Sequence, residues 1–319
     1  MSTPETSMNL TARWFQAVEA TGDFMGIRYG RKPASSEEVE WAFVSHCDCD
    51  GIGGFARLLR NSGAKLHVLP ETKHPNREII KPLWKLWRKS RSVGKVATRQ
   101  DWDLSKRQEA GSSQVVAWHL FTEEETEQIR QNCRRMNVTV NSFLLKYLDQ
   151  AVRPDLKKST AAIPWMIPVN LRGDIKHDDD TENHVSCVEP LVAAEDSPED
   201  IQRQIRHCLA SGEHRANYLI LGMGRFLSPR AKINLISKNR DKPEGNIGAF
   251  SNLGVWDREK VIDTSDSWFF CPPVCKGQLL GAGCVTFQNR LSLTIQANLN
   301  FPDQPDIAKT WMARWIGAL

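Results

Sequence analysis

The sequence contains no apolar run that approaches the roughly 20 residues needed for a membrane-spanning helix. Its first residues, Met1 to Asn9, lack an apolar core preceded by basic residues, so they do not resemble a secretory signal peptide. We also find no internal repeat and no low-complexity tract. These absences disfavour an integral membrane protein and a repeat protein, and we expect a soluble, cytoplasmic protein.

The net charge disfavours a nucleic-acid-binding protein, and the cysteine spacing disfavours a disulfide scaffold. The formal net charge is only +4 over 319 residues, whereas nucleic-acid binding calls for dense basic clustering. The eight cysteines lie at irregular spacings, which is not the pattern of a small disulfide scaffold, so we expect reduced thiols. An apolar content of 40% and a charged content of 25% are those of an ordinary globular protein.

Apolar periodicity predicts helices and strands that do not follow a strict β-α order. The expected helices cover residues 10–20, 55–60, 122–135, 138–152, 198–209, 218–227 and 306–316. The expected strands cover residues 38–44, 65–69, 114–120, 162–169, 184–191, 248–253, 283–287 and 291–298. Residues 73–107, rich in Lys, Arg, Trp and Pro, are the expected crossover or linker. This order predicts an α/β sandwich with a large mixed sheet.

The most informative pattern is a histidine followed four residues later by Asp-Gly, at the end of an apolar run. The stretch reads Trp41-Ala-Phe-Val-Ser-His46-Cys-Asp-Cys-Asp50-Gly51. It predicts that His46 stands at the mouth of a buried strand, where an imidazole can take a proton from a hydroxyl or an amine. Gly51, with Gly53 and Gly54, is expected to form the turn that follows.

This stretch resembles the HxxxDG signature of the acyltransferase superfamily that contains chloramphenicol acetyltransferases, condensation domains, alcohol acyltransferases and wax ester synthases. Other segments resemble the same superfamily in the same order. These are residues 120–145, like the element that opens the second lobe, 167–172, like the PVxLR strand end, 183–186, like the start of the next strand, and 250–254, like the SNxG turn. Each short motif is weak alone, but the shared order makes the resemblance specific.

The resemblance implies a two-lobed chloramphenicol acetyltransferase-like α/β sandwich. In two-lobed relatives the HxxxDG strand lies much further from the start of the chain. We therefore expect a shortened, truncated N-terminal lobe over residues 1–112, which carries the motif, and a fuller C-terminal lobe over residues 113–319. Ser45 stands where relatives often carry a second histidine.

The resemblance also implies acyl transfer from a coenzyme A or carrier-protein thioester to a hydroxyl or amine, without a covalent acyl-enzyme. His46 would act as the general base. Asp50 would pair with an arginine to hold the loop, and that partner is Arg172 or an arginine of the basic segment. No metal and no tightly bound cofactor are implied, because the acyl thioester is a co-substrate.

Two further roles follow from the same resemblance. Gly51 is expected to supply a permissive backbone angle and close approach for the substrate. The thioester oxygen becomes an oxyanion and needs a hydrogen-bond donor, for which Ser251 or Asn252 is the candidate. The active site is expected in a channel between the lobes, with donor and acceptor arriving from opposite faces.

Other interpretations of single patterns are weaker. His46, Cys47, Asp48 and Cys49, with Cys271 and Cys275, carry metal-ligating atoms, but neighbouring side chains on a strand alternate in direction and cannot all reach one ion. The Trp- and Lys-rich run 79–89 could contact a membrane surface or the phosphates of coenzyme A. A half-buried crossover helix is favoured for it, so peripheral membrane contact is not expected.

Two alternative functions stay open at the level of sequence. One is a non-catalytic condensation-domain-like protein that binds a carrier protein, a small molecule or a partner subunit through the same cleft. The other is an enzyme completed by oligomerisation, in which a neighbouring subunit supplies what the first lobe lacks.

Overall fold

The computed structural model describes residues 10–23, 25–63, 116–157, 161–172, 179–240, 245–256, 265–275, 277–298 and 307–319. The α-helices are α1 (Leu10–Glu19), α2 (Gly51–Asn61), α4 (Glu123–Arg135), α5 (Val140–Val152), α6 (Pro198–Ala210), α7 (Glu213–Met223), α8 (Pro229–Arg240) and α9 (Ile307–Ala318), with short 3₁₀ helices η2 (Arg153–Asp155) and η3 (Gly224–Phe226). The strands are β1 (Gly26–Lys32), β2 (Glu40–Ser45), β3 (Val116–Leu120), β4 (Ile163–Pro164), β5 (Ile167–Asn170), β6 (Val185–Val188), β7 (Leu191–Val192), β8 (Gly248–Val255), β9 (Ser267–Cys271), β10 (Leu280–Phe287) and β11 (Arg290–Ala297).

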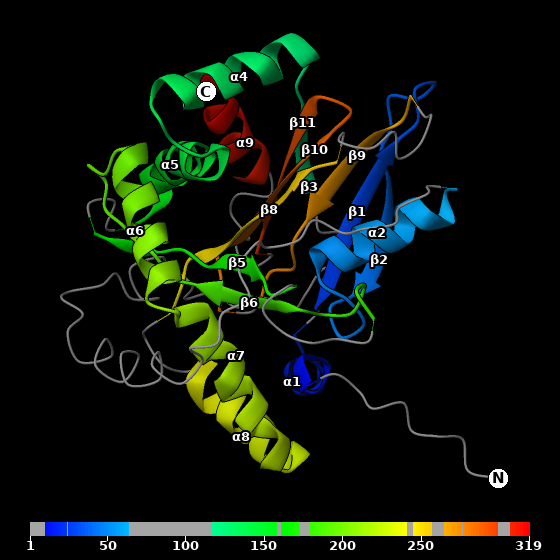
Figure 1. The fold of residues 1–319 in the computed structure, drawn as a ribbon, viewed down its shortest axis with the longest axis vertical. Helices are drawn as coiled ribbons and strands as arrows, with labels where there is room; N and C mark the ends of the chain where they lie inside the picture. Colours follow the sequence, from blue (N-terminus) through cyan, green and yellow to red (C-terminus); the bar gives the residue numbers. More distant parts are fainter. Residues whose placement is uncertain are drawn as a thin grey trace.

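A four-stranded sheet has the order β3-β11-β10-β8. β10 and β11 pair antiparallel through a tight turn in which Gln288 and Asn289 have positive φ angles of 48° and 62°, as two-residue hairpins of this kind require. β8 pairs parallel with β10, so the sheet is mixed, as predicted. α5 and α9 cover one face of it (Figure 1), where Trp311 and Trp315 are fully buried.

A second sheet, of order β2-β1-β9, carries the strand that leads to His46. β1 pairs antiparallel with both of its neighbours. β9 approaches β10 closely because Gly283 has no side chain there: a Cβ atom on Gly283 would lie 2.1 Å from the Phe270 carbonyl oxygen. The Thr294 hydroxyl also donates to that carbonyl at 2.5 Å. These contacts fix the second sheet against the first.

α2 packs between the two sheets through the Phe55 ring. The ring centroid lies 4.9 Å from that of Trp256 and 5.8 Å from that of Trp268, and both pairs are nearly perpendicular. Leu59, one turn further along, is also fully buried. Burial of each large apolar side chain contributes roughly 1.5–3 kcal/mol. This packing fixes the first turn of α2, and with it the loop that precedes the helix.

α1, α7 and α8 lie together at one end of the molecule, away from α4 and α9 (Figure 1). The Trp14 indole N–H donates to the Leu221 carbonyl at 2.7 Å. Gly224 admits the indole, since a Cβ atom there would lie 2.3 Å from the Trp14 ring. α1 is thereby held against the connection between α7 and α8.

Several predicted boundaries are confirmed and others are wrong. The helix predicted over residues 122–135 forms as α4, and Thr122 and Glu125 make a capping box at its start. The helix expected to begin at residue 218 begins at Glu213, directly after Gly212, whose φ of 75° ends the preceding helical path. β1, β9 and α8 were not predicted. The strand expected at 65–69, the crossover at 73–107, the run 79–89 and the lobe boundary at 112–113 lie outside the described residues.

Candidate functional site

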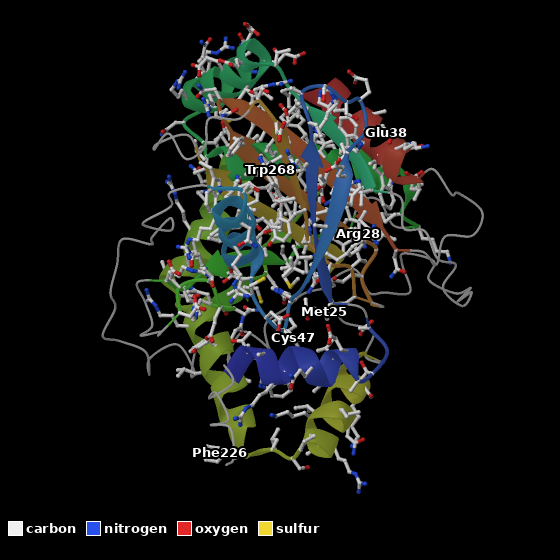
Figure 2. All side chains as sticks on the ribbon, turned by 90° about the vertical axis from the view of Figure 1, so that its right-hand side faces the viewer. Met25, Arg28, Glu38, Cys47, Phe226 and Trp268 are labelled. Atoms are coloured by element: carbon white, nitrogen blue, oxygen red, sulfur yellow. The ribbon has the colours of Figure 1, made fainter. Side chains whose placement is uncertain are left out.

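The loop between β2 and α2 holds the histidine of the HxxxDG motif. The backbone N–H of His46 donates to the Met25 carbonyl at 2.8 Å, which ties the loop to the start of β1. Asp50 caps α2 by accepting from the Gly53 N–H at 2.8 Å. His46 therefore sits in a short loop that is anchored at both ends. Figure 2 shows Met25 and Cys47 at the end of this sheet that faces α1.

The hydrogen bonds of His46 fix the tautomer of its ring. Nδ1 lies 2.9 Å from the Cys49 carbonyl oxygen. A carbonyl oxygen only accepts, so Nδ1 carries the proton in the neutral ring and Nε2 carries the lone pair. The Asn183 amide nitrogen donates to the His46 carbonyl oxygen at 2.7 Å and also lies 3.1 Å from Nδ1. Among the described residues, none hydrogen-bonds to Nε2.

The Phe15 ring of α1 covers part of the His46 imidazole. The two ring centroids are 4.3 Å apart and the planes are inclined by 32°. Burial lowers the pKa of His46 below its ordinary value, and the Cys49 carbonyl, Asp50 and Glu19 oppose the shift only in part. The imidazole is therefore neutral at pH 7, which is the form that accepts a proton.

Asp50 forms a buried ion pair with Arg172, one of the two partners that the sequence left open. The guanidinium binds both carboxylate oxygens, with Nη1–Oδ2 at 2.8 Å and Nη2–Oδ1 at 3.0 Å. Both side chains are almost fully buried. The His184 N–H donates to the same carboxylate at 2.8 Å. Asp50 thus joins α2 to the loop before β6.

Gly51, Gly53 and Gly54 form the first turn of α2, so the prediction that they make a separate turn is wrong. The helix starts at Gly51 because the Asp50 side chain caps it. Gly51 does not have a positive φ, so the permissive backbone angle expected for it is wrong as well. What Gly51 provides is close packing, since a Cβ atom there would lie 2.9 Å from Leu253 and from Phe270.

A substitution at Gly53 can test how tightly the first turn of α2 is packed. A Cβ atom on Gly53 would lie 2.1 Å from the Thr181 carbonyl oxygen, and a backbone atom cannot yield as a flexible side chain does. We expect Gly53→Ala to lower the free energy of unfolding by about 1–3 kcal/mol in urea denaturation. Gly317→Ala, in α9 with no atom within 4 Å of the new Cβ, should change it by no more than about 1 kcal/mol. Equal effects of the two substitutions would contradict the close packing.

The two candidate oxyanion donors, Ser251 and Asn252, lie on opposite faces of β8, because successive side chains on a strand alternate. Ser251 shares the face of Leu253, whose side chain packs beside Gly51, and it is buried. The Asn252 side chain accepts from the Gly254 N–H at 2.8 Å and so shapes the end of the strand. Ser251 is therefore on the side of the α2 N-terminus, and Asn252 is not.

The cysteines near His46 are poor nucleophiles. Burial raises the pKa of Cys47 to about 11 and that of Cys49 to about 12, so both are thiols at neutral pH. In the part of the chain that the structure describes, no three His, Cys, Asp or Glu side chains are grouped so that they could hold a metal ion.

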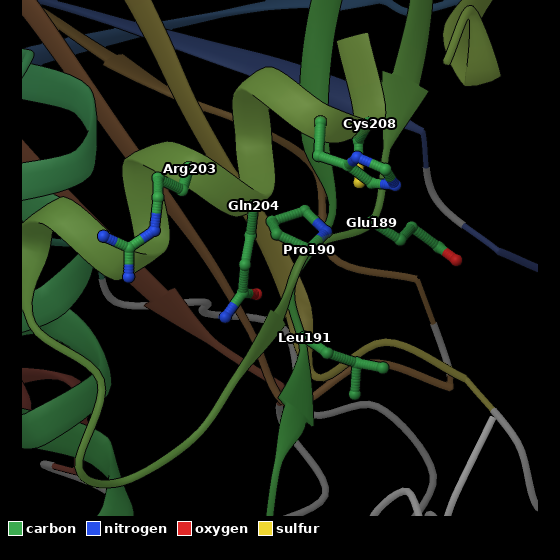
Figure 3. A pocket seen from close by; sticks show the side chains of 7 residues that line it. Glu189, Pro190, Leu191, Arg203, Gln204 and Cys208 are labelled. Atoms are coloured by element: carbon green, nitrogen blue, oxygen red, sulfur yellow. The ribbon is translucent and has the colours of Figure 1, made fainter. Parts of the chain in front are cut away.

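A cavity of about 430 Å³ lies between α6 and the β6–β7 connection (Figure 3). It is lined by Glu189, Pro190, Leu191, Arg203, Gln204, His207 and Cys208. None of the predicted site residues borders it. The cavity is therefore separate from the His46 loop.

Sequence reasoning assigned no role to two residues that contact the His46 ring or its carbonyl. Asn183 belongs to the segment that resembles the superfamily, but nothing local in the sequence links it to a residue 137 positions away. Phe15 was assigned only to an apolar helical stripe. The stripe predicts that the side chain is packed but not what it packs against.

No protein-family model matches the sequence, and no curated protein matches it either. Solved structures do resemble the fold. A trichothecene 15-O-acetyltransferase from Fusarium sporotrichioides is 13% identical with a TM-score of 0.56, over 91% of this chain and 70% of that one. A condensation domain of the enacyloxin polyketide synthase is 13% identical with a TM-score of 0.52, over 87% of this chain and 56% of that one. An epimerization domain of tyrocidine synthetase B is 14% identical with a TM-score of 0.50, over 87% of this chain and 68% of that one.

At these identities the likeness shows the fold alone. The chain shares the overall fold of these acetyltransferase, condensation-domain and epimerization-domain structures. The resemblance predicted this fold, and the comparison confirms it. None of the helices in the described ranges is long and apolar enough to cross a membrane.

Proposed function

We propose that the protein transfers an acyl group from a coenzyme A or carrier-protein thioester to a hydroxyl or amine, with Nε2 of His46 as the general base. One observation supports the proposal most directly. The Cys49 carbonyl holds Nδ1 as the donor, so the lone pair of the neutral ring is on Nε2, with no hydrogen-bond partner among the described residues. A base with a pKa below 6.5 is already unprotonated at pH 7.

In the proposed reaction, His46 takes one proton from the acceptor and later gives it to the leaving thiolate. Nε2 takes the proton of the acceptor O–H or N–H as that atom attacks the thioester carbonyl. The tetrahedral intermediate then collapses, the C–S bond breaks, and the imidazolium returns the proton to the leaving thiolate. The products are the ester or amide and a free thiol, and the protein is unchanged.

Four of the surrounding side chains support this role without touching the reacting atoms: Phe15, Asn183, Asp50 and Arg172. Phe15 removes water from one side of the imidazole, and Asn183 and the Cys49 carbonyl hold its orientation. Asp50 and Arg172 hold the loop. Of the two oxyanion candidates, the face of β8 on which Ser251 lies favours that hydroxyl over Asn252.

A direct assay tests the proposal. The full chain is incubated with acyl-CoA or acyl carrier-protein donors of graded length and with libraries of alcohols and amines, and acylated acceptors are identified by mass spectrometry. We expect acceptor-dependent release of coenzyme A with at least one pair. A chain that yields no acylated product from either coenzyme A or carrier-protein thioesters would favour the alternative of a non-catalytic binding protein.

The pKa of His46 determines how the rate of acyl transfer falls as the pH is lowered. Because burial lowers its pKa, the rate should rise with pH and reach half its plateau below pH 6.5. Phe15→Ala uncovers the ring, so the midpoint should move up towards 6.5. The measurement is kcat/KM against pH for both proteins. A midpoint that stays in place, or moves down, contradicts the role given to Phe15.

A further inference from the structure

Exposed apolar side chains gather on the hairpin formed by α7, η3 and α8. Six large apolar side chains are exposed among the described residues, and four of them belong to this hairpin: Ile220 (44% exposed), Phe226 (77%), Leu227 (39%) and Leu235 (41%). Figure 2 shows Phe226 at the far end of the molecule, beyond α1. The five consecutive residues 226–230 are all exposed. The connection between the two helices is therefore a protruding apolar tip.

After Glu213, the first residue of α7, the charged side chains of the same hairpin are all positive. Between residues 214 and 240 the sequence has no Asp or Glu, and its cations are Arg215, Arg225, Arg230, Lys232, Lys238 and Arg240. The side chains of Arg230 and Lys238 are exposed. Lys232 is buried, with its ammonium 5.8 Å from the centre of the Trp14 ring. The positive charge thus accompanies the apolar tip.

We propose that the α7–η3–α8 hairpin docks the protein on an anionic lipid surface, with Phe226 and Leu227 at the boundary between headgroups and acyl chains. Exposed apolar side chains flanked by cations are the two signals that together hold a protein at a bilayer interface. A protruding apolar tip suits insertion between lipids, because its exposed side chains can reach the acyl chains while the flanking cations stay at the headgroups. The charge of the hairpin is complementary to anionic headgroups.

The hairpin is a rigid part of the fold, which allows it to orient the whole molecule. α1 anchors it through the hydrogen bond from Trp14 to the Leu221 carbonyl. The next residue, Phe15, contacts His46. A single helix therefore touches both the docking hairpin and the proposed base. Docking itself does not depend on the proposed acyl transfer, and it lies outside residues 79–89, the segment for which the sequence raises the alternative of membrane contact.

Vesicle flotation with the full chain tests the proposal. We expect partition onto vesicles that contain phosphatidylglycerol, and much weaker partition onto vesicles of phosphatidylcholine alone. Phe226→Ser should lower the partition coefficient about tenfold, and Lys238→Glu about fivefold or more. Because both residues are exposed, the variants should fold, which a thermal melt followed by circular dichroism verifies.

Phe43→Ser is the matched control. Phe43 is 53% exposed and lies on β2, outside the hairpin, so the same chemical change there should leave partition unaltered. The proposal is overturned if the wild-type protein stays off anionic vesicles at low salt, or if Phe226→Ser and Phe43→Ser behave alike. Binding to an acidic carrier protein through Arg230 and Lys238, without vesicle binding, would overturn it in favour of a protein partner.

Discussion

His46→Ala should lower the rate of acyl transfer by about 10²- to 10⁴-fold, the usual contribution of a positioned general base. The expected loss is in kcat, because the imidazole accepts a proton only as the acceptor attacks. His46→Gln should be equally slow. Its amide can still donate to the Cys49 carbonyl, so the loop would be kept while the base is lost. The measurement is acylated product formed per unit time with the best donor and acceptor pair.

His119 provides a control for this substitution. It is another histidine whose pKa is lowered by burial, but it lies on β3 beside Phe121 and not on the His46 loop. His119→Ala should leave the rate close to that of the wild-type protein. If His46→Ala retains the wild-type rate, or if both alanine variants lose the same activity, His46 is not the base.

Arg172→Met should produce the largest loss of stability, about 3–5 kcal/mol in the free energy of unfolding. The substitution leaves the Asp50 carboxylate buried without its cation, and a buried charge that loses its partner is far more costly than an exposed one. It also removes the donors to the carbonyls of Asp180 and Glu182. Chemical denaturation at neutral pH measures the effect.

Two further variants distinguish the stability lost with the buried ion pair from the stability lost when any arginine is replaced. Arg31 pairs with Asp266, but its side chain is 48% exposed, so Arg31→Met should cost no more than about 1 kcal/mol. Asp50→Asn combined with Arg172→Met should recover part of the loss, since neither charge is then buried alone. A loss below about 1 kcal/mol for Arg172→Met would contradict the structural role of the pair.

Local sequence signals predicted the parts of the site that are local in the chain. The spacing of His46, Asp50 and Gly51 identifies a strand end followed by a helix start. The alternation of side chains along a strand could also have predicted that Ser251 and Asn252 lie on opposite faces of β8. The alternation of Ile27 and Tyr29 was a comparable signal for β1 that the sequence analysis did not use.

The Cys49 carbonyl that contacts Nδ1 is local in the chain, but two other contacts of His46 come from distant segments and could not be predicted this way. Phe15 precedes it by 31 positions and Asn183 follows it by 137. Each is placed by packing of whole elements: α1 against the α7–α8 hairpin, and the loop before β6 against the Asp50–Arg172 pair. The choice of Arg172 over the arginines of the basic segment likewise required the structure.

The protonation of the two ring nitrogens of His46 tests the central claim most directly. Nitrogen-15 NMR of the histidine side chains, assigned with the His46→Gln variant, distinguishes the two tautomers and follows the titration. We predict a neutral ring at pH 7 with the proton on Nδ1, an unprotonated Nε2, and a midpoint below pH 6.5. A proton on Nε2 in the neutral ring, or a charged imidazole at pH 7, would contradict the account.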